Sequence, residues 1–110
     1  MTVLLFDSDL IFSSKVKATV KRIGLECEVV GQLEDLASAT PANVQMIILN
    51  LDLFGQAYDS LHKFSEHGAT MLGYYSHVNV SLKQLANEHN VVSFPRAVFI
   101  SKLEEMLSRV

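Results

Sequence analysis

The sequence contains one cysteine, Cys27, two prolines and no tryptophan. A single cysteine cannot form a disulfide within the chain, so a disulfide-stapled secreted scaffold is excluded and a reducing cytoplasmic location is expected. Long apolar runs are also missing, and none approaches the roughly 20 residues of a membrane-spanning helix. The amino-terminal segment reaches Asp7 early and has no basic residues before it, so it does not predict a signal peptide.

Charge is scarce as well. Nine basic and twelve acidic side chains give a net charge of −3, so no basic excess predicts a nucleic-acid or anionic-membrane partner. Hydrophobic residues make up 49% of the 110 residues, which is typical of a chain that folds around a core. This length is enough for one compact domain and too short for two, so residues 1–110 are expected to form a single domain.

Short apolar segments bounded by polar residues recur along the chain, and they predict β-strands. The expected strands cover residues 2–6, 25–30, 44–51, 70–75 and 91–94. The third, VQMIILNL, has the strongest pattern and is expected at the centre of a sheet. The second, LECEVV, alternates apolar and acidic residues and is expected nearer an edge.

Between these segments, apolar residues recur every three or four positions, which is typical of helices that bury one face. The clearest stripe consists of Phe12, Val16, Val20 and Ile23, and Gly24 is the expected helix end. Further helices are expected near residues 32–39 and 57–64, from position 79 or 81 through 86, and from 99 through 110.

Five strands alternating with five helices predict a parallel sheet with helices on both faces. The compact solution is a flavodoxin-like, doubly wound α/β fold with strand order 2-1-3-4-5, although the pattern alone leaves the order open. In such a sheet the functional site lies at the carboxyl ends of the first and third strands. Asp7, Ser8 and Asp9 follow the first strand, and Asn50 and Asp52 lie at the end of the third.

Four segments, LLFDSD, MIILNLDLFG, MLGYYSH and VVSFPR, resemble the receiver domain of bacterial response regulators, the CheY-like family. The resemblance covers essentially the whole chain. It implies two acids after the first strand, a phosphoacceptor aspartate at the end of the third, a Ser or Thr ending the fourth, and Lys-Pro after the fifth. Asp7 matches the first acid. Four positions depart from the pattern: Ser8 replaces the second acid, Asn50 the acceptor, Gly73 the hydroxyl residue and Phe94 the lysine.

Two alignments near these positions stay open. Tyr75 or Ser76 could provide the hydroxyl if the loop differs, and Arg96 could provide a positive charge in a rearranged loop. Taken alone, Asp9 is expected to cap the helix that follows it.

The departures matter because receiver phosphorylation requires a carboxylate nucleophile, with Mg²⁺ and a lysine neutralising the phosphoryl oxygens. An asparagine amide is a poor nucleophile and cannot form an acyl phosphate. The sequence therefore predicts a degenerate pseudo-receiver: a non-enzymatic, phosphorylation-independent signalling module that needs no cofactor. The alternative is a longer third strand that ends at Asp52. That register predicts a Mg²⁺-dependent receiver or phosphoryl-transfer site displaced to Asp7, Asp9 and Asp52.

The resemblance also implies a protein-binding surface on the fourth helix, fifth strand and fifth helix, where a signalling partner or a second copy could bind. The candidate contributors are Val78, Leu82, Phe94, Val98 and Phe99. Because adjacent strand residues face opposite ways, one of Tyr74 and Tyr75 is expected in the core, and the other could line a partner surface near the end of the fourth strand. His62 and His67 are spaced to fall on different helix faces, so the histidines are expected to be surface or packing residues.

Overall fold

The computed structural model describes residues 2–55, 58–76 and 80–107. The strands are β1 (Thr2–Phe6), β2 (Glu26–Val30), β3 (Val44–Asn50), β4 (Thr70–Tyr75) and β5 (Val92–Pro95). The α-helices are α1 (Leu10–Arg22), α2 (Leu33–Ser38), α3 (Leu51–Phe54), α4 (His62–Glu66), α5 (Val80–Glu88) and α6 (Arg96–Leu107). A 3₁₀ helix, η1 (Tyr58–Leu61), leads directly into α4.

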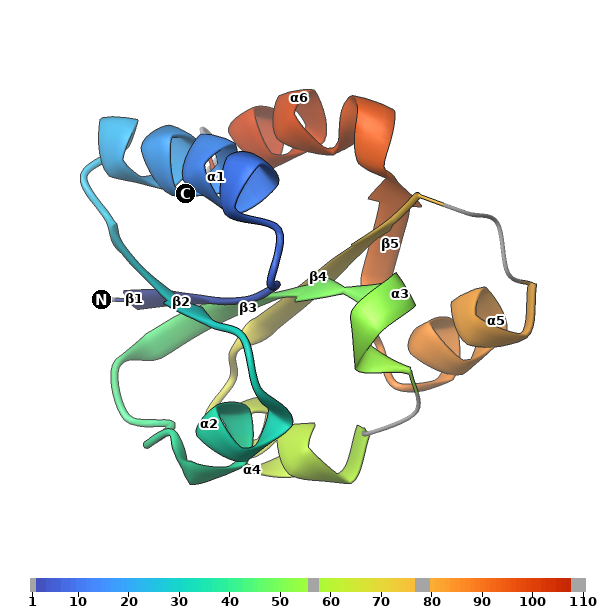
Figure 1. Ribbon diagram of the computed structural model, residues 1–110. Coiled ribbons are helices and arrows are strands. Elements are labelled where there is room, and N and C mark those ends of the chain that lie inside the picture. Colours follow the sequence, from blue (N-terminus) through green and yellow to red (C-terminus); the bar gives the residue numbers. More distant parts are fainter. Residues whose placement is uncertain (1, 56–57, 77–79, 108–110) are drawn as a thin grey trace.

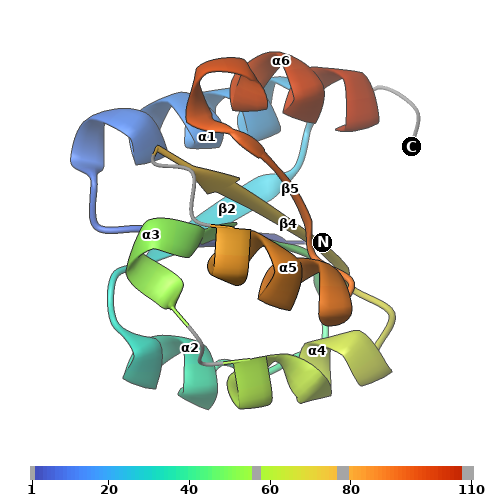
Figure 2. The same cartoon turned by 90° about the vertical axis from the view of Figure 1, so that its right-hand side faces the viewer.

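The strands form one parallel sheet in the order β2-β1-β3-β4-β5, which confirms the flavodoxin-like order. Helices α1 and α6 cover one face, and α2, α4 and α5 cover the other (Figure 1). The view turned by 90° shows the sheet edge-on between these two helical layers (Figure 2). None of the helices in the described ranges is long and apolar enough to cross a membrane.

Each face of the sheet has its own core, because successive strand residues point to opposite sides. In β1, Val3 and Leu5 pack toward α1 and α6, whereas Leu4 and Phe6 pack toward the other layer. All four side chains are at most 2% exposed. Burial on both faces explains why the interior strands β1 and β3 are apolar runs, whereas the edge strand β2 alternates.

The first helix ends earlier than its apolar stripe predicts. Phe12, Val16 and Val20 are buried, but Ile23 is 41% exposed because it is the C-cap residue of α1 and lies past the last helical turn. Gly24 follows with φ of +90°, a left-handed conformation that glycine adopts without strain.

The helical region after β3 also differs from the predicted single helix. It is divided into α3, which starts at Leu51 immediately after the strand, and the η1–α4 segment. Leu61 and Phe64 of the predicted stripe are buried, and Ala57 lies outside the described residues. Gly55, with φ of +66°, ends α3 after one turn.

Both tyrosines at the end of β4 are buried. Tyr74 is 0% and Tyr75 9% exposed, which corrects the expectation that one of them would line a partner surface. The reason is that β4 is an interior strand with helices on both faces, so either direction leads into a core.

Candidate functional site

Asp7 and Asn50 meet at the carboxyl ends of β1 and β3. These strands are neighbours, with Phe6 opposite Leu49, so the residues that follow lie side by side. The Asn50 side-chain amide donates a hydrogen bond to Asp7 Oδ1 at 3.0 Å. The Asn50 Oδ1 atom accepts from the backbone N–H of Asp52 at 3.1 Å and so caps α3. The residue at the expected acceptor position therefore acts as a hydrogen-bonding link.

The Asp7 carboxyl group is almost completely buried, with 2% of the residue exposed. Besides the Asn50 amide, it accepts the backbone N–H of Asp9 at 3.0 Å on Oδ1 and the Tyr74 hydroxyl on Oδ2. Burial, the hydrogen bond to Asp7 and the negative charge of Asp7 all raise the pKa of Tyr74, so the phenol keeps its proton and remains a donor. Three donors thus satisfy this buried carboxyl group from within the protein.

Asp9 joins the starts of two helices. Its Oδ1 atom accepts the backbone N–H groups of Ile11 and Phe12, at 3.0 and 3.1 Å, and caps α1 as expected. Its Oδ2 atom accepts from the guanidinium group of Arg96, the first residue of α6. The guanidinium carbon also lies 4.3 Å from the centroid of the Phe12 ring.

The ion pair changes the protonation of both partners. The hydrogen bond from Arg96, followed by that from the Phe12 N–H, lowers the pKa of Asp9 below its usual 3.8. The same bond raises the pKa of Arg96. A positive charge is therefore present at the site, but it comes from Arg96 and already has a carboxylate partner.

The hydroxyl group in the site comes from Tyr74. Strand pairing places Tyr74 beside Asn50 and Gly73 beside Leu49. Gly73 has a packing role, since a Cβ atom there would lie 3.0 Å from both Cγ and Cδ2 of Leu51. Sequence reasoning considered Gly73, Tyr75 and Ser76 and missed Tyr74. The sequence signal that could have identified Tyr74 was the length of β4. This strand continues past Gly73, so Tyr74 lies at the level of Asn50.

Two further departures lie beside this network. Ser8 is exposed, directly after the buried Asp7. Phe94 is half-buried in β5, where it pairs with Tyr74 and packs against the core on the α1 and α6 side. An aromatic ring therefore occupies the position at which the resemblance implies a lysine.

The three carboxylates of the alternative site are not gathered together. β3 ends at Asn50, and Asp52 lies in the first turn of α3 with its Oδ2 atom accepting the backbone N–H of Ser76 at 2.8 Å. Asp7 and Asp9 have the separate partners described above. Within residues 2–55, 58–76 and 80–107, no group of three or more Asp, Glu, His or Cys side chains is placed to hold a metal ion.

The expected partner surface corresponds to α5, β5 and α6. Val98 is 41% exposed, and Leu82 and Phe94 are partly exposed. Phe99 is a correction: it is 0% exposed, because α6 starts at Arg96 and turns Phe99 toward the sheet, with its ring centroid 4.9 Å from that of Tyr74. Val78 lies outside the described residues. Val80 and Val92, which sequence reasoning did not select, are 63% and 50% exposed.

Comparison with solved structures shows that the fold is that of CheY-like receiver domains. The ChxR receiver domain from Chlamydia trachomatis has 12% identity and a TM-score of 0.66, covering 99% of this chain and 97% of that one. A CheY-like receiver domain protein from Methanospirillum hungatei has 12% identity and a TM-score of 0.68, covering 98% and 94%.

An atypical orphan response regulator, whose structure revealed a phosphorylation-independent regulatory mechanism, has 16% identity and a TM-score of 0.70, covering 98% and 96%. No protein-family model and no curated protein matches the sequence. At these identities the likeness establishes the fold.

Proposed function

We propose that this chain is a receiver-like signalling module that acts through protein–protein contact and does not accept a phosphoryl group. The observation that carries the proposal is the role of Asn50 at the end of β3. Its amide nitrogen donates to Asp7 and its oxygen caps α3, so the side chain is held as a neutral hydrogen-bonding group. An amide nitrogen shares its lone pair with the carbonyl group and does not attack phosphorus as a carboxylate does.

The charges around Asn50 support the same proposal. A phosphoryl group requires free cations that neutralise its oxygens, either a metal ion or a lysine. Here Arg96 is already paired with Asp9. The position in β5 at which the resemblance implies a lysine holds Phe94, which lies beside Tyr74 of β4 and carries no charge. Asp7 accepts hydrogen bonds from three groups and is turned inward. We therefore propose no catalytic activity and no resident cofactor.

Intact-mass measurement after incubation with Mg²⁺ and acetyl phosphate tests the proposal. We expect the mass of the wild-type protein to remain unchanged. The Asp52→Asn variant is measured in parallel because Asp52 is the acceptor in the alternative register. A stable phosphoryl adduct on the wild-type protein would contradict the proposal, and its loss in Asp52→Asn would assign the phosphoryl group to Asp52.

The proposed partner surface consists of α5, β5 and α6. Its exposed apolar side chains, Val80, Val92 and Val98, lie on three consecutive elements. A protein is favoured over a nucleic acid because the chain has a net charge of −3. We propose that a signalling protein or a second copy of this chain binds there, in the cytoplasm, where the single thiol of Cys27 would stay reduced.

A further inference from the structure

A polar pocket lies near the amino ends of β4 and β5, at the opposite end of the sheet from Asp7. It has a volume of about 220 Å³ and lies between the η1–α4 segment and the end of α5. Its lining includes two imidazoles, those of His62 from α4 and His89 from the residue after α5, and the thioether of Met71. No residue of the Asp7 network lines this pocket.

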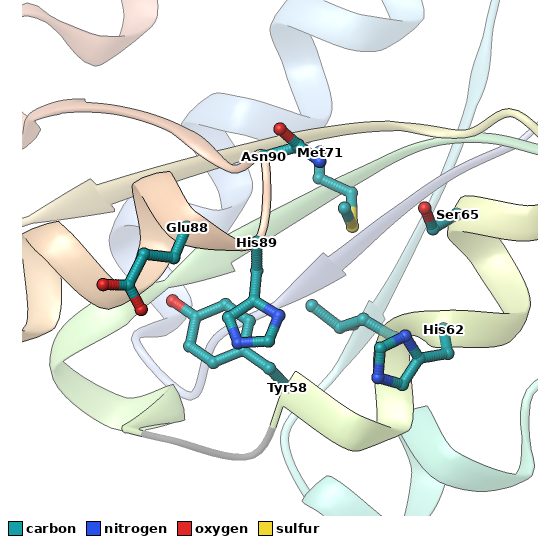
Figure 3. Close-up of a pocket in the computed structure, with 8 residues that line it drawn as sticks. Tyr58, His62, Ser65, Met71, Glu88, His89 and Asn90 are labelled. Atoms are coloured by element: carbon teal, nitrogen blue, oxygen red, sulfur yellow. The ribbon is translucent and has the colours of Figure 1, made fainter.

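The two imidazoles are close enough to share an ion. Their ring centroids lie 6.4 Å apart, with the ring planes at 63°. Figure 3 shows the two rings in the lower part of the view, with Met71 above them. Imidazole suits Zn²⁺, Cu²⁺ and Ni²⁺, and a zinc–nitrogen bond is about 2.0–2.1 Å long. The exposed His62 side chain can rotate to complete such a bond, while His89 is held in place.

His89 is held by an aromatic stack. Its ring lies parallel to that of Tyr58, with 4.5 Å between centroids and 8° between planes (Figure 3). Tyr58 is itself buried, at 3% exposure, and its ring packs edge-on against that of Phe54, so it serves as a fixed platform. A ligand that is oriented before the ion arrives loses little side-chain freedom on binding.

His62 has a neighbouring carboxylate of the kind that commonly supports a metal-bound histidine. Asp59 Oδ1 lies 3.8 Å from His62 Nε2. Metal-binding histidines usually donate their second ring N–H to such a carboxylate, which fixes the tautomer. A rotation of the exposed His62 side chain that brings Nε2 within hydrogen-bond distance of Asp59 would leave Nδ1 available for the ion.

We propose that His62 and His89 form a two-imidazole site for a divalent ion of the Zn²⁺ and Cu²⁺ class, with water in the remaining positions. The two imidazoles would be the only histidine, cysteine or carboxylate ligands, since no group of three or more such side chains gathers in the described part of the chain. The ion would tie α4 to the end of α5. This site is independent of the proposed signalling function.

Calorimetric titration of the full chain with Zn²⁺ alone, with thermal unfolding as a second readout, tests this site. We expect saturable binding by the wild-type protein and a rise in Tm, because an ion that binds the native state stabilises it by mass action. The His62→Ala variant should bind at least tenfold more weakly and lose the Tm rise. His62 is exposed and its removal should leave the fold intact.

The matched control is His67→Ala. His67 is an exposed histidine at the C-cap of the same helix, outside the pocket, and its Nδ1 atom lies 2.8 Å from the backbone oxygen of Lys63. Its removal should leave Zn²⁺ binding unchanged. The proposal is overturned if the wild-type protein shows no saturable binding, if His62→Ala binds as tightly as the wild type, or if His67→Ala weakens binding to the same extent.

Discussion

Gly73 lies where an added side chain would press against the side chain of Leu51. It lies in the buried strand β4, where an added Cβ atom would be 3.0 Å from both Cγ and Cδ2 of Leu51. Overpacking of a close-packed core typically costs about 1–3 kcal/mol. We therefore expect Gly73→Ala to lower the free energy of unfolding by about 1–3 kcal/mol, as measured by urea denaturation.

Gly31→Ala is the matched control for this prediction. The nearest atom to its added Cβ would be the backbone oxygen of Asp7, at 3.8 Å, which is ordinary van der Waals contact. We expect its free energy of unfolding to stay within about 0.5 kcal/mol of the wild type. Equal stability of the Gly73→Ala variant would show that Leu51 has room to move, contrary to the packing described.

At the scale of elements, the Asp9–Arg96 pair connects the N-cap of α1 to the start of α6. Because the folded protein lowers the pKa of Asp9 below 3.8, this carboxylate stabilises the fold fully at pH values above its unfolded pKa. That contribution is lost as the pH falls through the lower pKa of the folded state. The wild-type protein should therefore lose stability as the pH falls below about 4.

The Asp9→Asn variant isolates this effect, because asparagine caps helices as well as aspartate does but carries no charge. We expect it to be less stable than the wild type at neutral pH, and the difference should shrink as the pH falls below about 4. Chemical denaturation across this pH range provides the measurement. The control is Asp35→Asn, which removes the charge of an exposed residue of α2. A constant difference between wild type and Asp9→Asn would count against a role for the charge.

At the scale of the whole molecule, the α5–β5–α6 surface is the proposed site of self-association. Val92 is 50% exposed on β5, which is an edge strand of the sheet. If a second copy covers this surface, Val92→Lys should shift a concentration-dependent dimer toward monomer, because a lysine at a sheet edge opposes pairing. Sedimentation equilibrium over a range of protein concentrations measures this shift.

The corresponding control is Leu33→Lys, which replaces an exposed apolar residue of α2 outside this surface. It should leave the association unchanged. A wild-type protein that stays monomeric at every concentration would argue against the homodimer and leave a different protein as the proposed partner. Equal effects of both substitutions would argue against a specific interface.

The sequence by itself determined the five strands, the main helical stripes and the residue at the end of β3, but not the division of the helical region after β3 into α3 and η1–α4. Strand and helix patterns are local, because burial of a face imposes a period of two or 3.6 residues on the residues that form it. This is why the five strands, the stripe of Phe12, Val16 and Val20, and the position of Asn50 were predicted without coordinates. The helix boundaries near Ile23 and Phe99 were harder to predict, because the apolar period continues past a helix end and does not mark where capping stops or starts the helix.

Only the tertiary structure decided how the site is held together. The Tyr74 hydroxyl reaches Asp7 across 67 sequence positions, and Arg96 reaches Asp9 across 87. Such contacts depend on strand order and on the register between β3 and β4, which periodicity does not specify. The sequence determined that the residue at the end of β3 is an asparagine, Asn50. The packed sheet decided that this amide, a phenol and a backbone N–H together satisfy Asp7 from within the protein.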